Sequence, residues 1–463
     1  MLIKEKSKFR RGILAIAISG LSLASTATYA GYDHDDDDDD DDRHHKKSYT
    51  LTGACSHLPA SRATEFHGNA NNSDLNLGMA GNQWVVFDHV MQGFNVSRGI
   101  SPTGIPSHLP NGSYTLADLN EKARQYYIQL IPPGQIRDQI KSGCMILGNE
   151  DDRNFLPGSV QVDFDIFAST NYTLMQDLAN NGFVSEAIPY IKNKLDLMVD
   201  ADNSQGIGTA GAPGSYENTQ DILMDLLDSS IVVSEVDHIN EGVHKAINKM
   251  YQAMDEYVRE NGPTSDIAAL DSALAAVATP QAGSPAALRT GVSTNFDLAT
   301  NANCHYTGHA TIADGTLKFC EFAILNKSNT HETRVHHVET PAKILDGTAH
   351  VGPVWTSELK FAQAAGDAVS GMDQVGGSGG VSSPAAASPA VNAPATYSIA
   401  VVATAENAKR AKQFINYVRS PDGQSKYTDG GFIGLTAAEM DAGQCYAADG
   451  TMTPRTGGCN DDD

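Results

Sequence analysis

One repeated order of residues constrains the fold of this chain more than any other feature of its sequence. In three places an apolar strand runs into a short turn of small or polar residues, and the turn opens a helix. The three units cover residues 75–83, 127–135 and 160–171. Repeated strand–helix units predict an α/β fold, and ligands of such sheets bind at the carboxyl ends of the strands. The turn residues are therefore the first candidates for a site.

The same order continues in the second half of the chain. Residues 195–199 and 231–236 are predicted strands, and the second of them runs into the polar turn 237–242. Behind this turn, apolar residues recur at helical spacing. A last predicted strand covers residues 397–402, and the helix that follows it carries apolar residues up to Val418.

Residues 335–358 combine two polar turns with a buried strand. Proline is favoured at the first position of a helix, so a short helix is predicted to begin at Pro341, with His337 and Thr340 in the turn before it. Residues 349–355 carry almost no charge, as in a strand that is covered on both faces. The polar residues that follow this strand open the next helix.

The N-terminus predicts export. Residues 1–30 hold a basic start, an uncharged apolar stretch and small residues at a cleavage position, which is the pattern of a signal peptide. Removing this segment, with its five basic residues and one acidic residue, takes the formal net charge from −24 to −28. A charge of this sign disfavours binding to nucleic acid and anionic lipid.

Six cysteines in an exported chain predict disulfide bonds. Cys304 and Cys320 flank a turn and are expected to pair, Cys445 and Cys459 form a second expected pair, and Cys55 with Cys144 follows by elimination. The neighbouring His305 and His309 allow a metal site as an alternative to a plain disulfide loop. Without a stronger pattern, no metal and no cofactor is predicted.

Several segments interrupt or flank the regular pattern. An aspartate-rich arm that cannot fold against itself, an insertion that holds the first cysteine pair, a low-complexity loop and a polar tail are expected at residues 31–73, 262–334, 376–395 and 436–463. The arm is either a solvated spacer or a weak binder of divalent cations.

Four segments that occur in one order resemble a known family. They read DIFASTNYTLMQDLANNGF, YIKNKLDLMVDADNSQGI, VGPVWTSE and YSIAVVATAENAKRAKQFINYVRSPDGQSKYTDGGF. They are similar to the periplasmic solute-binding proteins of ABC importers, in particular the molybdate, tungstate and sulfate type. The resemblance covers about residues 74–435, and the closing segment is its most specific part.

The resemblance implies a two-lobed α/β fold with two crossing strands and a ligand cleft between the lobes. The crossing strands would be residues 195–199 and 397–402. One lobe would hold residues 74–188 and 396–435, and the other would hold residues 189–395. The receptor would close on its ligand by a hinge motion about the crossing strands.

Carried over by position, the family's ligand contacts fall on the polar turns of this chain. The residues implied in this way are Asn82, Gln83, Ser169, Thr170, Asn171, Asn240, Glu241, Gly242, Thr340 and Trp355. The polar turns and helix starts of the sequence itself add Gly134, Gln135, His337 and Thr356 as candidate ligand contacts. Backbone N–H groups at helix starts and hydroxyl groups suit a small anion.

The implied function is capture of a small anionic solute for the membrane permease of an ABC importer, by a periplasmic monomer. The family's paired serines in the first turn are replaced here by Asn82 and Gln83, and Glu241 and Glu339 add acid. The ligand is therefore either an oxyanion such as molybdate, tungstate or sulfate, or a small organic or phosphorylated acid. The alternative function is an exported sensory or surface protein without a transporter, whose arm binds divalent cations.

Enzyme motifs are missing from the sequence. It contains no HExxH or Walker motif, and its GxSxG match, residues 376–380, lies in the glycine-rich low-complexity loop rather than between a predicted strand and helix. Asp163 and Asp165 share one face of a predicted strand and resemble a catalytic acid pair, but a solvated or helix-capping role is commoner for such residues. No enzymatic activity is predicted.

Overall fold

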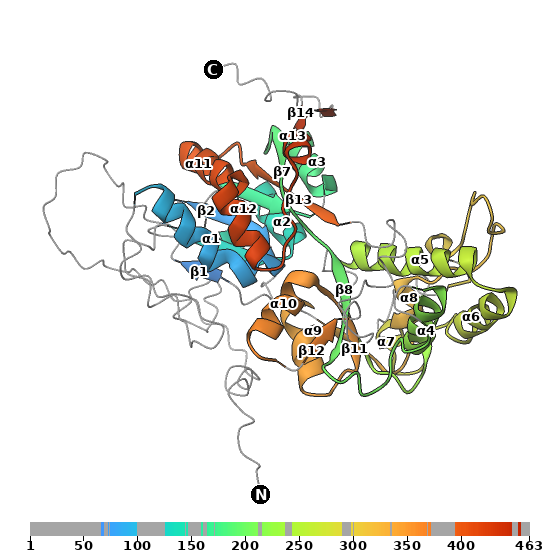
Figure 1. The fold of residues 1–463 in the computed structure, drawn as a ribbon. Coiled ribbons are helices and arrows are strands. Elements are labelled where there is room, and N and C mark those ends of the chain that lie inside the picture. The colour runs from blue at the N-terminus through green and yellow to red at the C-terminus, as the bar shows by residue number, and fades with distance from the viewer. Residues whose placement is uncertain are drawn as a thin grey trace, which may run out of the picture. The chain divides into compact units, whose positions relative to one another are not determined.

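The computed structural model shows an α/β fold with two principal sheets (Figure 1). It describes residues 66–68, 73, 75–99, 126–143, 145–146, 159–160, 164–170, 172–211, 215–236, 243–288, 298–299, 301–333, 336–367, 369–371, 394–446 and 452–454. Most of the low-complexity loop lies outside these residues, and so does the expected arm 31–73 apart from residues 66–68 and 73. The expectation of an unfolded arm is wrong at residues 66–68, which form a strand paired with residues 127–129.

The larger sheet has eight strands in the order β1-β3-β2-β6-β13-β7-β14-β15. Its strands are β1 (Phe66–Gly68), β2 (Asn76–Ala80), β3 (Tyr127–Ile131), β6 (Ile166–Ser169), β7 (Glu186–Asn193), β13 (Ala395–Val401), β14 (Gln444–Tyr446) and β15 (Met452–Pro454). β2 pairs in parallel with β3 and β6, whereas β13 is antiparallel to both β6 and β7. We call this sheet and its helices the first lobe.

Helices cover both faces of the larger sheet, as the apolar strands predict. One face packs against α1 (Trp84–Ser97), α11 (Ala408–Arg419) and α12 (Pro421–Asp429). The other face packs against α2 (Pro133–Ser142) and α3 (Tyr172–Asn180). A Cβ atom on Gly78 would lie 2.3 Å from Ile136 Cγ2, so only glycine lets α2 pack this closely on β2.

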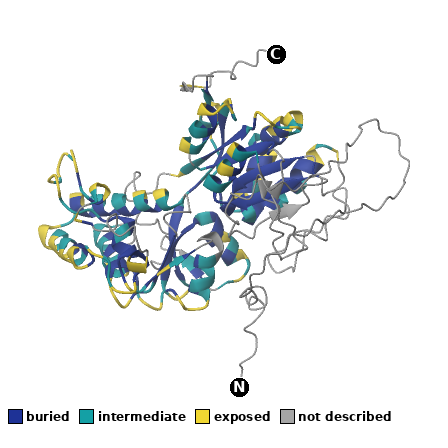
Figure 2. Cartoon of the chain, turned by 180° about the vertical axis from the view of Figure 1, so that it is seen from behind, coloured by how far each residue is buried: buried dark blue, intermediate teal, exposed yellow. Residues whose placement is uncertain are grey.

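The smaller sheet has five strands in the order β10-β9-β11-β8-β12. They are β8 (Leu195–Asp200), β9 (Val233–Val236), β10 (Thr330–Thr333), β11 (Val351–Trp355) and β12 (Val369–Gly371). One face packs against α4 (Tyr216–Leu227), α5 (His244–Asn261), α6 (Thr264–Ala276) and α8 (Glu321–Leu325), and the other against α9 (His336–Leu345) and α10 (Thr356–Ala364). This is the second lobe. Buried residues follow the strands of both sheets, and exposed ones gather on the outer helices (Figure 2).

The chain passes from the larger sheet to the smaller sheet between two consecutive strands, β7 and β8. β7 ends at Asn193 in the larger sheet, and after Lys194 the chain continues as β8 in the smaller sheet (Figure 1). The predicted strand 195–199 therefore begins where the chain changes sheet. β7 stays in the larger sheet beyond residue 188 because it pairs with β13 as far as Asn193.

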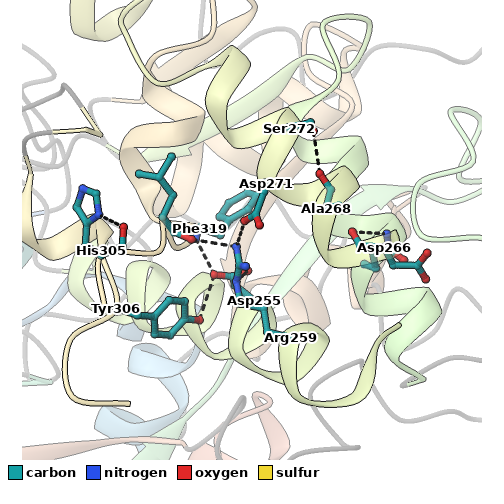
Figure 3. A network of polar contacts seen from close by, with 12 residues as sticks. Asp255, Arg259, Asp266, Ala268, Asp271, Ser272, His305, Tyr306 and Phe319 are labelled. Carbon is teal, nitrogen blue, oxygen red and sulfur yellow. Dashed lines mark hydrogen bonds and ion pairs between the residues drawn. The ribbon is translucent and has the colours of Figure 1, made fainter. Parts of the chain in front are cut away.

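A network of buried polar groups stabilises the second lobe (Figure 3). Arg259 Nε lies 2.9 Å from Asp255 Oδ1, and Arg259 Nη2 lies 2.7 Å from Asp271 Oδ1. The other carboxylate oxygen of Asp255 accepts hydrogen bonds from Tyr306 Oη and Phe319 N. The network joins α5, α6 and the segment that the disulfide closes.

The Cys304–Cys320 disulfide is present, as predicted. Cys445 is also disulfide-bonded, whereas Cys55, Cys144 and Cys459 lie outside the described residues. The range 262–334 holds α6, α7 (Pro285–Leu288) and α8, and it ends in the sheet strand β10. The order of strands and helices thus continues through a range that the sequence pattern does not resolve.

Two other expectations differ from the structure. The helix predicted to begin at Pro341 begins at His336, and Pro341 lies inside it. Pro341 lies beyond the first four residues of the helix, whose N–H groups have no partner within it, so it removes the one hydrogen bond that its N–H would have donated to residue 337. The expected polar tail contains α13 (Ala437–Asp441) and two strands of the larger sheet, with β14 pairing with β7.

Candidate functional site

Three of the predicted turns lie at one edge of the larger sheet. Ala80 at the end of β2 pairs in register with Ile131 at the end of β3, and β6 runs parallel on the other side of β2. The residues after these strands therefore follow one another along the carboxyl edge of the sheet. They are Asn82, Gln83, Gly134, Gln135, Ser169 and Thr170.

Asn82 and Gln83 lie in the single 3-10 turn Gly81–Gln83 (η4) between β2 and α1. Both side chains are buried. Asn82 Nδ2 donates a hydrogen bond to Tyr397 Oη. Gln83 Oε1 accepts hydrogen bonds from Tyr190 Oη at 2.7 Å and from Tyr427 Oη at 3.1 Å. The first turn thus ends in a buried layer of amides and tyrosine hydroxyls.

Tyr397, which belongs to this layer, also contacts the second lobe. Its ring centroid lies 6.0 Å from that of Trp355, the last residue of β11, and 6.0 Å from that of Phe432. Burial raises the pKa of Tyr397, so its hydroxyl is a neutral hydrogen-bonding group. Tyr397 therefore connects Asn82 in the first lobe to Trp355 in the second.

Asn193 forms a second connection between the lobes, beside the change of sheet. Asn193 Oδ1 accepts a hydrogen bond from Thr356 Oγ1 at 2.9 Å, and Asn193 Nδ2 donates to Ser357 Oγ at 2.8 Å. Thr356 and Ser357 open α10. A Cβ atom on Gly431 would lie 3.0 Å from Ser357 Cα, so the end of α12 also approaches the start of this helix.

Predicted residues of the second lobe also follow parallel strands. β9 pairs in parallel with β10 and β11. Thr340 is buried in α9, and its Oγ1 lies 3.1 Å from Ser234 Oγ of β9. The structure places His337 on the first turn of α9 rather than in the turn before a helix. Its side chain, together with Asn171 and residues 240–242, lies outside what the structure describes.

The predicted residues do not all gather in one cluster. Asn82, Gln83, Trp355 and Thr356 meet through Tyr397 and Asn193. Ser169 pairs in register with Ser398, the neighbour of Tyr397, and successive residues of a strand face opposite ways. Ser169 therefore lies on the α2–α3 face of the sheet, whereas Tyr397 lies on the α1 face. Gly134 and Gln135, in the first turn of α2, belong to the same edge.

Glu358 is the carboxylate that lies next to this cluster. Its Oε2 accepts a hydrogen bond from the backbone N–H of Trp355 at 3.0 Å, and the residue is buried. A carboxylate in this position caps the start of α10. The other side chains of this cluster are neutral amides, hydroxyls and aromatic rings. Lys360 of α10 also reaches the first lobe, because its Nζ donates a hydrogen bond to Thr428 O of α12.

The structure offers one group of potential metal ligands among the described residues, Glu256, Glu260 and His309. His309 Nε2 lies 2.8 Å from Glu256 Oε1, and His309 Nδ1 accepts from the backbone N–H groups of Thr311 and Ile312. An imidazole whose Nδ1 accepts hydrogen bonds carries its proton on Nε2, the atom that faces the carboxylate. This geometry fits a hydrogen-bonded His–Glu pair rather than a metal site.

The suspected acid pair contains a structural aspartate. Asp165 is buried, and its two carboxylate oxygens accept hydrogen bonds from the backbone N–H groups of Asn76 and Asn407. Both oxygens therefore connect segments of the first lobe. Asp163 lies outside the described residues.

Sequence reasoning missed four residues of the cluster, Tyr190, Asn193, Tyr397 and Tyr427. All four are buried, and three of them lie in strands. A tyrosine within an apolar strand is indistinguishable from a core residue in the sequence. The one available signal was the position of a polar residue, because Asn193 stands two residues before the predicted crossing strand.

A comparison with protein families gives one match. Residues 124–433 match the model of the bacterial extracellular solute-binding proteins. The match includes Tyr190, Asn193, Trp355 and Tyr397, whereas Asn82 and Gln83 precede it. No curated protein matches the chain at a significant level. Within the described residues, no helix has the length and apolar character needed to cross a membrane.

Solved structures show distant similarity. The periplasmic molybdate-binding protein of Azotobacter vinelandii has 12% identity and a TM-score of 0.40, with 78% of this chain and 100% of that chain covered. The sulfate-binding protein of Mycobacterium tuberculosis has 13% identity and a TM-score of 0.42, with 80% and 89% covered. A periplasmic binding protein of Actinobacillus pleuropneumoniae with fructose-6-phosphate bound has 10% identity and a TM-score of 0.40, with 77% and 82% covered. These similarities identify no ligand residue in this chain.

Proposed function

Because the chain belongs to the bacterial extracellular solute-binding proteins, we propose that it captures a small anion and delivers it to the permease of an ABC importer. The family is one of binding proteins that act outside the cytoplasm. The proposal concerns the anionic nature of the solute and the residues that hold it. An oxyanion such as molybdate, tungstate or sulfate and a small organic or phosphorylated acid are the candidate ligands.

One observation carries the proposal: a cluster of amides and hydroxyls joins the two lobes, with Glu358 as the one carboxylate beside it. Amide groups of Asn82, Gln83 and Asn193 and hydroxyl groups of Thr356 and Tyr397 lie where the carboxyl edge of the larger sheet meets the start of α10. Buried N–H and O–H groups stabilise an anion strongly, because little water competes with them. The residues Gly134, Gln135, Ser169 and Thr170 extend the proposed site along the same edge.

The two tryptophans of the chain provide a direct test. The Trp84 ring centroid lies 4.5 Å from that of Phe361 in α10, and Trp355 lies beside Tyr397. Both indoles therefore lie at contacts between the lobes. We expect binding of the correct anion to change the intrinsic fluorescence, and the variants Trp84→Phe and Trp355→Phe to show which indole reports it.

The titration uses molybdate, tungstate, sulfate, phosphate and citrate, with sodium chloride at equal ionic strength and putrescine as controls. The same ligands are added in thermal unfolding, where a ligand at about 100 times its Kd stabilises the folded state by about 2.7 kcal/mol. The proposal is wrong if no anion of the panel changes either the fluorescence or the unfolding transition. It is also wrong if putrescine alone does so.

A further inference from the structure

The two polar atoms of the Gln83 amide differ in their hydrogen bonding among the described residues: Oε1 accepts hydrogen bonds, and Nε2 has no partner. Its Oε1 accepts two hydrogen bonds, from Tyr190 Oη and Tyr427 Oη. Its Nε2 is buried and has no hydrogen-bond partner among the described residues, and the residue is 0% exposed. A buried polar group without a partner is rare in folded proteins and calls for an explanation.

The two tyrosine hydroxyls determine which way the amide points. Among the described residues, Gln83 Oε1 is the only acceptor of either hydroxyl proton. Turning the amide over would place its NH₂ group against both hydroxyl oxygens and leave both hydroxyl protons without an acceptor. Burial raises the pKa of both tyrosines, so the hydroxyls stay protonated at physiological pH and remain donors.

We propose that Tyr190 and Tyr427 are positioning residues that hold the Gln83 amide as a fixed N–H donor, and that this donor selects solutes with hydrogen-bond acceptor oxygens over ammonium solutes. The inference rests on the proposed function, because it assigns Gln83 to the solute site. It adds that Tyr190 and Tyr427 determine which end of the Gln83 amide faces the solute, and that this orientation disfavours ammonium groups.

The physical basis of the selection is a difference between two bound states. An oxyanion or carboxylate accepts a hydrogen bond from Nε2, so the buried donor gains a partner. An ammonium group brings N–H against N–H, and both remain unsatisfied in a buried place. Sites that leave buried polar groups unpaired with the wrong ligand discriminate strongly against it.

Replacing Tyr190 and Tyr427 with phenylalanine removes their hydroxyls without changing the size of the packed rings. The ring centroids of Tyr190 and Tyr427 are 5.8 Å apart, and Tyr427 lies 5.5 Å from Phe432. Phenylalanine keeps this edge-to-face packing and removes only the hydroxyl. Gln83→Glu keeps the size of the side chain and its two accepted hydrogen bonds, and replaces the N–H donor with a carboxyl oxygen. The affinities are measured at pH 9, above the pKa of about 8 that burial gives the comparable carboxyl of Glu235, so that this oxygen is ionised and cannot donate.

The experiment measures the affinities of the wild type and the variants for the tightest-binding anion of the panel and for putrescine. Gln83→Glu is expected to weaken anion binding about 100-fold, and Tyr190→Phe/Tyr427→Phe about tenfold. The double variant should also narrow the preference for the anion over putrescine, because the freed amide can turn Oε1 toward the ligand. A loss of stability alone would not change this preference.

Tyr417→Phe is the matched control. Tyr417 Oη donates to Asp422 Oδ2 at 2.9 Å in the same lobe, and this bond does not involve Gln83. This variant should keep the wild-type affinities. If the double variant does not fold, the single variant Tyr427→Phe, which removes the longer of the two bonds, is measured instead.

The outcomes separate the two proposals. A wild-type protein that binds no anion overturns the proposed function. A wild type that binds an anion, with Gln83→Glu equal to it in affinity, overturns the inference alone. The inference is equally overturned if the tyrosine variant keeps both the affinity and the preference of the wild type.

Discussion

Thr356 Oγ1 lies 2.9 Å from Asn193 Oδ1 and donates a hydrogen bond to it, so the first residue of α10 is attached to the last residue of β7. Asn193 is fully buried and also donates to Ser357 Oγ. This pair joins the two lobes beside the point where the chain changes sheet.

Replacing Asn193 with alanine should lower the free energy of unfolding by about 2–3 kcal/mol, because two hydrogen bonds to α10 are lost and buried hydroxyls remain unpaired. Thr356→Val keeps the shape of the side chain and removes one bond, so it should cost only about 1 kcal/mol. Urea unfolding of both variants measures the difference. Equal stabilities of the two variants would show that Asn193 does not connect the lobes in this way.

The buried carboxyl of Glu235 predicts a dependence of stability on pH. Glu235 in β9 accepts hydrogen bonds from Tyr251 Oη at 2.8 Å and Val236 N at 2.9 Å. Burial raises the pKa of Glu235 from 4.5 to about 8. Between these values the unfolded chain is ionised while the folded protein keeps its proton, so stability is complete below pH 4.5 and falls as the pH rises towards 8, by about 1.4 kcal/mol per pH unit.

Glu235→Gln should remove this contribution. The variant matches the wild type near pH 4.5 and should exceed it by on the order of 3–4 kcal/mol at pH 7.5. Denaturant unfolding of both proteins from pH 4.5 to 8 tests this. Parallel stability curves over that range would mean that Glu235 is ionised in the folded protein.

Arg259 illustrates how the exposure of its partners sets the energy of an ion pair. Its side chain is 3% exposed and lies against Asp255, which is 0% exposed, and against Asp271, which is 45% exposed. Arg259→Ala leaves Asp255 buried without its cation and should cost about 3–5 kcal/mol. Asp271→Ala should cost less than about 1 kcal/mol. Thermal unfolding that ranks Asp271→Ala as the more harmful change would contradict this assignment.

The disulfide Cys304–Cys320 should stabilise the second lobe. It closes a segment with a sequence separation of 16, and a loop of this size corresponds to about 3 kcal/mol. The double variant Cys304→Ser/Cys320→Ser is the appropriate measurement, because a reductant would also open the bond of Cys445. A variant as stable as the oxidised wild type would show that the Asp255–Arg259 network holds this segment without the disulfide.

The sequence predicts the strands well where their pattern is simple. Residues 127–131 form a strand as expected, and the turns 80–83 and 132–135 do lie at strand ends, because apolar runs bounded by Gly and Pro leave few alternatives. The start of α9 was misplaced because Pro341 is tolerated inside the first turns of the helix. The strands of the tail have only three residues each, and β14 joins the sheet by pairing with the distant strand β7, so local sequence does not reveal them.

The candidate site was predicted only in part, for a physical reason. Asn82, Gln83, Trp355 and Thr356 follow strands directly, and position along the chain therefore identifies them. Tyr190, Tyr397 and Tyr427 contribute through contacts between residues that are far apart in sequence, such as the bond between Asn82 and Tyr397. Only the folded chain brings these groups together.

The order of strands in the larger sheet has a consequence for how the protein is made. Its central strand β13 comes from residues 395–401, while its neighbour β6 comes from residues 166–169. During synthesis from the N-terminus, β6 and β7 therefore lack β13, the strand that lies between them, until the second lobe has been translated. In a nascent chain that ends before residue 395, one edge of β6 and both edges of β7 lack their partners, because β14 also follows β13, and unpaired strand edges are templates for aggregation. Binding by a chaperone is expected to matter most at that stage of its synthesis.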